Sequence, residues 1–226
     1  MKPLRKGQRR RPAGRPRRMI TGLLLAAAIA VVLLSVQPAP ATIRGSAHDF
    51  SGVDPEQQIC IFCHTTHNAD TTVTDAPLWN HDVTTKNYQV YNSPSLDATP
   101  GQPAGASRLC LSCHDGTIAV DSYGDRTGVI FLGGDAAIGA DELTNDHPVS
   151  FTYDDSLAVQ DGELFLPSSA PSGMGGTIAQ DLLFNNQLEC ASCHDVHNGP
   201  AAAAVNDHLL TVTQVQSQLC LTCHNK

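Results

Sequence analysis

Eight cysteines in this chain of 226 residues follow one pattern, and each pair is followed directly by a histidine. The four copies span 60–64, 110–114, 190–194 and 220–224, and we number them motifs 1 to 4. Each copy reads C-x-x-C-H, which is the attachment signature of c-type haem. In that chemistry the two thiols add to the vinyl groups of the porphyrin, and the adjoining imidazole binds the iron.

The motifs therefore predict four covalently bound haem c groups. The attaching thiols are expected to be Cys60, Cys63, Cys110, Cys113, Cys190, Cys193, Cys220 and Cys223. The proximal iron ligands are expected to be His64, His114, His194 and His224.

Zinc, a disulfide framework and a redox dithiol explain the pattern less well. Zinc ribbons use C-x-x-C pairs, but they need no histidine after each pair. Disulfides occur in exported proteins, yet they leave the four histidines unexplained. A thioredoxin-like dithiol would occur once, in a βαβ pattern, and not four times.

Six histidines outside the motifs can supply the second axial ligand of four irons. Electron transfer by low-spin haem needs that ligand, and histidine in place of methionine gives a lower potential. Met174, the one methionine after residue 41, lies in a Gly-rich loop and is not expected to bind iron. We predict as distal ligands His48, His67, His147 and His197, with His81 and His208 as lower-ranked candidates.

Motifs 1 and 3 share the longer pattern C-x-x-C-H-x-x-H-N. His67 follows the proximal His64 by three residues, so it is held on the same side of the macrocycle and cannot complete that haem. It is expected to bind the iron of a different haem, and His197 after His194 is expected to do the same. Each of these two short peptides would then tie two haems together.

The elements that position these residues are expected to be short. Motifs 2 and 4 share L-C-L-[ST]-C-H, so the chain carries duplicated haem-pair units at 48–120 and 180–226, joined by a strand and loop segment at 121–179. Its patterns predict short helices and short strands, the helices within 177–190 and 209–220 and the strands at 128–132 and 148–153.

Bulky side chains for a core are few: the chain has one Trp, four Tyr and six Phe. Aromatic side chains normally supply large contact areas in a core, so a non-protein group is expected to take their place. The fold class we expect is a mostly irregular multihaem cytochrome c, with short helices and a few short strands wrapped around a haem stack.

The first 41 residues are typical of a secretory signal peptide. A basic head precedes an apolar run at 20–36, and Ala39 and Ala41 form a small-x-small cleavage site. We expect an exported domain at 42–226, extracellular or periplasmic, without membrane insertion after cleavage. The removed segment holds nine of the 14 basic and none of the 22 acidic residues, and the resulting net charge of −17 disfavours nucleic acid and anionic membranes as partners.

Six blocks of sequence resemble the doubled C-x-x-C-H cytochromes, most closely the tetrahaem cytochromes that polymerise into extracellular conductive filaments in metal-reducing microbes. The blocks are ICIFCHTTHNAD, APLWN, LCLSCHDGT, NDHPVSF, CHDVHN and LCLTCHNK, within 45–226. The resemblance implies bis-histidine ligation by the same distal set and alternating parallel and T-shaped haem pairs. It also implies that a neighbouring subunit can supply a distal ligand, for which His48 is the candidate by position.

These patterns favour an electron conduit that is not an enzyme, with redox proteins or further copies of itself as partners. A soluble periplasmic shuttle to a terminal reductase shares every feature above. A multihaem nitrite or hydroxylamine reductase would need an open iron with acid and base groups beside it. The surplus of histidines argues against an open iron.

Each motif should carry one haem through its thiols, and the thioether bonds should survive unfolding. Denaturing mass spectrometry of the mature protein should therefore show the polypeptide mass plus four haems. A variant with both Cys220→Ala and Cys223→Ala should retain three. A colourless protein with the mass of the bare polypeptide would refute the haem assignment.

Overall fold

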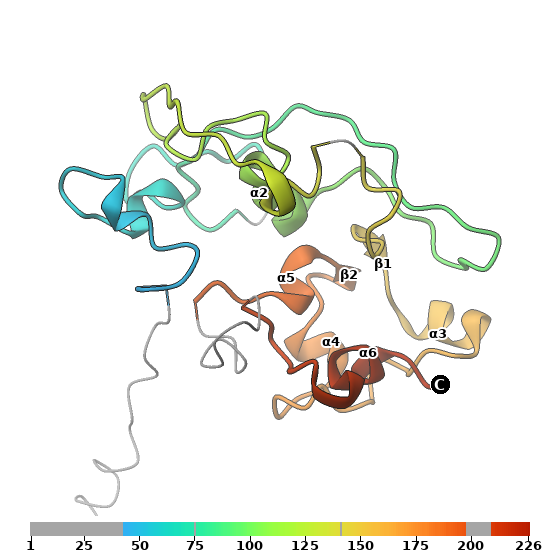
Figure 1. Cartoon of the computed structure of the whole chain (residues 1–226). Helices are drawn as coiled ribbons and strands as arrows, with labels where there is room; N and C mark the ends of the chain where they lie inside the picture. The colour runs from blue at the N-terminus through green and yellow to red at the C-terminus, as the bar shows by residue number, and fades with distance from the viewer. Residues whose placement is uncertain (1–42, 75, 141, 198–208) are drawn as a thin grey trace, which may run out of the picture. The chain divides into compact units, whose positions relative to one another are not determined.

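The computed structural model describes residues 43–226 except 75, 141 and 198–208 (Figure 1). All described residues lie in one compact unit, Ala41–Lys226. The predicted signal peptide at 1–41 and the lower-ranked candidate His208 lie outside the described residues.

Regular structure is short throughout the described chain. The α-helices are α2 (Gly105–His114), α3 (Asp155–Asp161), α4 (Ile178–Asp181), α5 (Cys190–Cys193) and α6 (Gln218–Cys223). The 3₁₀ turns are η1 (Phe50–Gly52), η2 (Cys60–Phe62), η3 (Gly134–Ala136) and η5 (Val215–Ser217), and the strands are β1 (Phe151–Thr152) and β2 (Gln187–Leu188). No helix in the described part of the chain has the length and apolar character to cross a bilayer.

Every C-x-x-C-H motif lies on a helical turn. Motif 1 begins in η2, motif 2 ends α2, motif 3 forms α5 and motif 4 ends α6. In three of them the histidine N–H donates to the carbonyl of the first cysteine, over 2.9 Å at His64, 3.0 Å at His194 and 2.9 Å at His224. Residues three apart on such a turn share one face, so both thiols of a motif point to the same side.

The expected helices are shorter than the sequence suggests. The capping box of Thr177 and Gln180 starts α4 as predicted, but the helix ends at Asp181. Asn185 and Asn186 then take positive φ angles, which return the chain into β2. Positive φ angles at Gln216 and Ser217 likewise confine the second predicted helix to η5 and α6.

Of the two expected strands, only the one at 148–153 is present, as β1 (Phe151–Thr152). It pairs antiparallel with β2, with Phe151 opposite Leu188. The prediction of a strand at 128–132 is wrong. The backbone N–H groups of Val129 and Ile130 donate instead to the buried Asp121 carboxylate, each over 2.8 Å.

The apolar core is divided into separate clusters. The largest joins β1, β2 and α4 through Phe151, Tyr153, Ala158, Ile178, Leu182, Leu183 and Leu188. Two smaller clusters are Val73, Trp79 and Leu109, and Tyr88, Leu111 and Leu143. The cluster of Val73, Trp79 and Leu109 lies against Cys63, and the largest cluster lies against Cys223. Both clusters therefore border on cysteines of the motifs.

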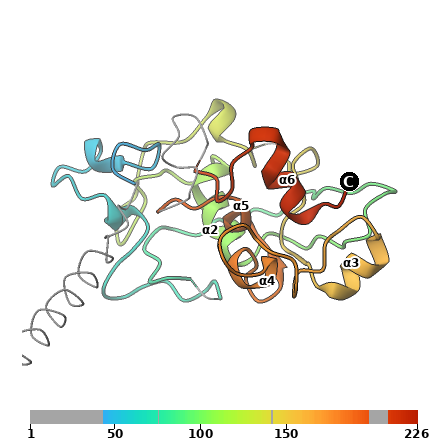
Figure 2. The same cartoon turned by 90° about the horizontal axis from the view of Figure 1, so that it is seen from below.

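Helices α2 and α5, which carry motifs 2 and 3, lie side by side (Figures 1 and 2). The buried Glu189 carboxylate joins them, because it accepts hydrogen bonds from the hydroxyls of Ser107 and, over 2.8 Å, Ser150. Ser107 Oγ in turn accepts from the backbone N–H of Cys190 over 2.9 Å. One carboxylate therefore fixes the relative position of two haem motifs.

Removing this carboxylate should destabilise the fold strongly. Glu189→Ala leaves two buried hydroxyls without their acceptor, so we expect a loss of roughly 2–4 kcal/mol in the free energy of unfolding. The exposed pair of Glu163 and Lys226 provides the matched control, and Glu163→Ala should leave the urea midpoint unchanged. Equal midpoints for the two variants would show that Glu189 does not join the helices.

Candidate haem site

None of the eight cysteines forms a disulfide. Burial raises the pKa of the second thiol of each motif, to about 11 at Cys63 and Cys193 and to about 12 at Cys113 and Cys223. Among the described residues no group of three or more His, Cys, Asp or Glu side chains is arranged to hold a metal ion by itself.

Three of the four motif histidines face a histidine that the sequence predicts as a distal ligand. The ring centroids are 5.9 Å apart for His48 and His114, 6.0 Å for His64 and His197, and 6.4 Å for His147 and His224. An iron between two imidazoles puts their centroids about 6 Å apart, because each metal–nitrogen bond is about 2 Å long and the centroid lies about 1 Å beyond the nitrogen. The three pairs therefore have the spacing of a histidine–iron–histidine bridge.

Backbone carbonyls fix the ring orientation of three of these histidines. The Nδ1 atom of His64 lies 2.6 Å from Pro77 O, that of His114 lies 2.7 Å from Ala136 O, and that of His147 lies 2.9 Å from Pro148 O. A carbonyl can only accept, so Nδ1 carries the proton and Nε2 keeps its lone pair. Metal-bound histidines make this same outer hydrogen bond, so the residues present fit haem iron.

Comparison with known families agrees with this geometry. Residues 184–226, which contain motifs 3 and 4, match the family model described as the doubled CXXCH motif. The chain carries the doubled motif of multihaem c-type cytochromes. Such motifs bind haem c covalently, and the proteins that carry them transfer electrons. No curated protein matches the chain.

The first thiols of motifs 2 and 3 lie against each other. A hydrogen bond between Cys110 and Cys190 raises the pKa of Cys110 and lowers that of Cys190. The attachment points of two haems therefore meet where α2 packs on α5.

His48 differs from His64, His114 and His147, whose Nδ1 atoms lie against backbone carbonyls. Its Nδ1 atom is buried, and no described residue makes a hydrogen bond to it. Burial, followed by the nearby imidazoles of His114, His194 and His197, lowers the pKa of His48 to about 4. The ring is therefore neutral at physiological pH, which is the form that binds a metal.

The predicted distal ligand His67 is exposed, beside motif 1. Its backbone carbonyl accepts from Thr65 Oγ1 over 2.9 Å, and the next residue, Asn68, has a φ of 56°. The role of His67 as a distal ligand stays a prediction.

The lower-ranked candidate His81 has a structural environment instead. Its ring is 2% exposed, with Nδ1 2.7 Å from Asp82 O and Nε2 2.9 Å from Ala119 O. Nε2 also lies 3.4 Å from Cys113 Sγ, so the ring lies against the second thiol of motif 2. The lower-ranked assignment of His81 as a distal ligand stays a prediction.

Sequence reasoning did not identify the groups that hold the motif histidines. The carbonyls of Pro77 and Ala136 are backbone atoms and have no signature in the sequence. Asp115, buried directly after His114, accepts from Tyr88 Oη over 2.7 Å and from Thr84 Oγ1 over 2.6 Å, and so anchors the end of α2. The one feature of the sequence that could have identified Asp115 is its position directly after a C-x-x-C-H motif.

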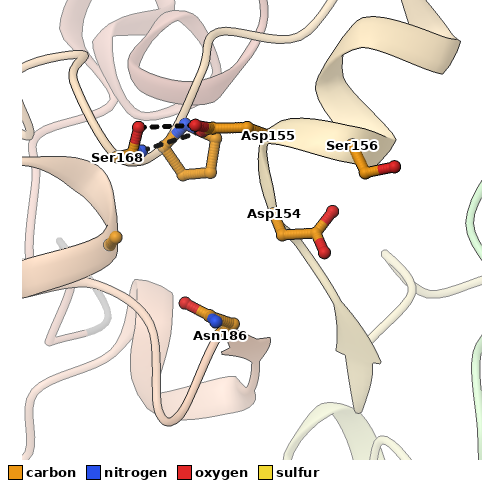
Figure 3. A pocket seen from close by; sticks show the side chains of 7 residues that line it. Asp154, Asp155, Ser156, Ser168 and Asn186 are labelled. Carbon is orange, nitrogen blue, oxygen red and sulfur yellow. Dashed lines mark hydrogen bonds between the residues drawn. The ribbon is translucent and has the colours of Figure 1, made fainter.

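A surface pocket between α3 and α4 lies apart from this chemistry. It is lined by Asp154, Asp155, Ser156, Pro167, Ser168, Ala179 and Asn186. Ser168 Oγ donates to Asp155 over 2.6 Å, so part of its acidic lining is satisfied within the chain (Figure 3). No cysteine or histidine lines it, and it takes no part in the haem site.

Two histidine variants should separate a ligand from a structural ring. His197→Ala should turn one haem from low-spin to high-spin, because the iron facing His64 loses its sixth ligand. His81→Ala should leave every haem low-spin and lower the free energy of unfolding by about 1–3 kcal/mol, since the hydrogen bond of a buried ring to a backbone carbonyl is lost. Electron paramagnetic resonance counts the high-spin irons, and a new one in His81→Ala would contradict this assignment.

Proposed function

We propose that this chain is a tetrahaem c-type cytochrome that conducts electrons along four covalently bound haems, each ligated by two histidines. One observation carries the proposal: His114, His64 and His224 each lie at bridging distance from a predicted distal histidine. Haem c supplies a one-electron couple between ferric and ferrous iron. The protein residues hold the rings in place and keep water from the iron.

The fourth pair follows from the repeat. His64 of motif 1 faces His197, which is three residues after the proximal histidine of motif 3. Motifs 1 and 3 have the same C-x-x-C-H-x-x-H-N pattern, so the reciprocal pair is His67 with His194. Each motif then supplies the proximal ligand of one haem and the distal ligand of the other. Two three-residue spacers thereby hold these irons close enough for fast electron exchange.

The other haem motifs lie near this reciprocal pair. His48, the partner of His114, is also close enough to His194 and His197 for their charges to lower its pKa. The contact of Cys110 with Cys190 joins motif 2 to motif 3. Burial and, after it, the nearby Cys193 thiol raise the pKa of Cys223, so motif 4 also lies near motif 3. These proximities support a continuous haem stack with irregular chain wrapped around it.

An assembly of many copies is the proposed working form. The exported chain resembles subunits of extracellular conductive filaments, and a homopolymer would extend the haem stack beyond one molecule. His48 lies beside His114 of its own chain, so a ligand from the neighbouring subunit is not part of the proposal. The soluble shuttle remains the second candidate, with a redox protein as its partner.

Electron microscopy and gel filtration of the mature protein separate these two forms. A conducting polymer should give long, regular fibres, whereas a shuttle should elute as a monomer. The monomer result would remove the filament and leave the cytochrome assignment in place.

A reductase is a less favoured function, because paired histidines occupy both axial positions of the iron. The reduced protein should therefore not turn over nitrite or hydroxylamine. Catalytic consumption of either, with reoxidation of all four haems at the rate of product formation, would make it an enzyme.

A redox titration tests the proposal directly. The mature protein should take up four electrons per chain at low potentials, as bis-histidine ligation dictates. His147→Met should raise the potential of one haem and leave three unchanged, because thioether ligation favours the ferrous state. Spectroelectrochemistry measures both. Uptake of fewer than four electrons would contradict the tetrahaem assignment.

A further inference from the structure

The distal ligands are not held equally firmly. Nδ1 of His147 lies 2.9 Å from the carbonyl of Pro148, and the motif histidines His64 and His114 have similar acceptors. For the buried Nδ1 of His48, no acceptor is found among the described residues. Loss of such an outer hydrogen bond weakens metal binding by roughly 10- to 100-fold. His48 is therefore expected to be the weaker ligand.

The segment that carries His48 is also attached weakly. Within 43–57 the backbone hydrogen bonds are local turns, such as Ser46 N–H to Ile43 O over 2.9 Å. Its described contacts with the rest of the chain include, besides the imidazoles near His48, the rings of Phe50 and Phe62, 5.2 Å apart, and a 3.4 Å hydrogen bond from Tyr123 to Asp54.

The segment of His147 is attached far more firmly. Leu143 N–H donates to Gln89 O over 3.0 Å, and Ser150 N–H donates to Leu188 O over 2.7 Å. These bonds fix the backbone on both sides of His147, before β1. The backbone of 43–57 makes no such bond to another segment of the described chain.

We propose that His48 is an exchangeable ligand, and that the haem of motif 2 binds a small neutral diatomic molecule, such as carbon monoxide or nitric oxide, when it is ferrous. In the exchange the bond from iron to His48 breaks and a bond from iron to the diatomic forms. No electron is transferred, and His48 leaves as a neutral imidazole. The inference rests on the proposed function, because it needs haem at motif 2.

Carbon monoxide binding to the reduced, fully loaded protein tests this inference. The haem content, measured first as the pyridine haemochrome, shows whether the proposed function holds, and four haems per chain are required. The wild type should then bind carbon monoxide at one haem in four. Its rate should reach a plateau with carbon monoxide concentration, because departure of His48 limits it.

His48→Ala identifies the haem. This variant should bind carbon monoxide at the same single haem, with a rate that rises linearly with concentration, because no ligand has to leave. Binding at two haems in His48→Ala would place the wild-type site elsewhere and overturn the proposal. Absence of any adduct in the wild type would overturn it as well.

Variants of the attachment test the cause. Phe50→Ala removes the ring contact with Phe62, and Tyr123→Phe removes the hydrogen bond to Asp54; each should raise the plateau rate several-fold. Phe184→Ala, at an exposed phenylalanine, is the matched control and should leave the rate unchanged. A plateau that is the same in all three variants would show that the segment does not control the exchange.

Discussion

The approach of two imidazoles from distant parts of the chain is the constraint on which the rest of this structure depends. Each C-x-x-C-H motif can form on its own, as a single helical turn closed by one hydrogen bond between histidine and cysteine. The second imidazole cannot, because it comes from another turn. The 6.0 Å separation of His64 and His197 shows the chain folded so that two such turns meet. The irregular segments between the motifs serve to bring these rings together.

This constraint explains why so little regular structure is needed. A helix or sheet normally buries one apolar face against another element, but here the apolar clusters are small and end at cysteines such as Cys63 and Cys223. Under the proposed function the porphyrins supply the missing apolar surface. Buried polar groups then take over part of the positioning, as Glu189 does between α2 and α5 and Asp115 does at the end of α2.

The local chemistry could be predicted from the sequence, and the long-range geometry only in part. The four motifs and their thiols follow from spacing alone, because attachment depends on five consecutive residues. His48, His147 and His197 could be proposed because four irons need four further ligands, but their pairing with particular motifs depends on the folded path. His81 was ranked lower as a ligand, and its folded environment, two backbone carbonyls and the thiol of Cys113, could not be predicted from the sequence. The strand expected at 128–132 is absent because Asp121, a side chain outside that window, binds its N–H groups.

The reciprocal arrangement of motifs 1 and 3 also shapes how the chain folds. His64 and His197 are about 130 residues apart in sequence, and a link across so long a loop restricts the unfolded chain far more than a local one. Under the proposed function, a bond from iron to a distal histidine thus links distant chain segments reversibly. It slows folding, because the two segments must come together late. Under the proposed function, haem can attach to each motif locally, whereas a low-spin centre at motif 1 also needs the distant His197.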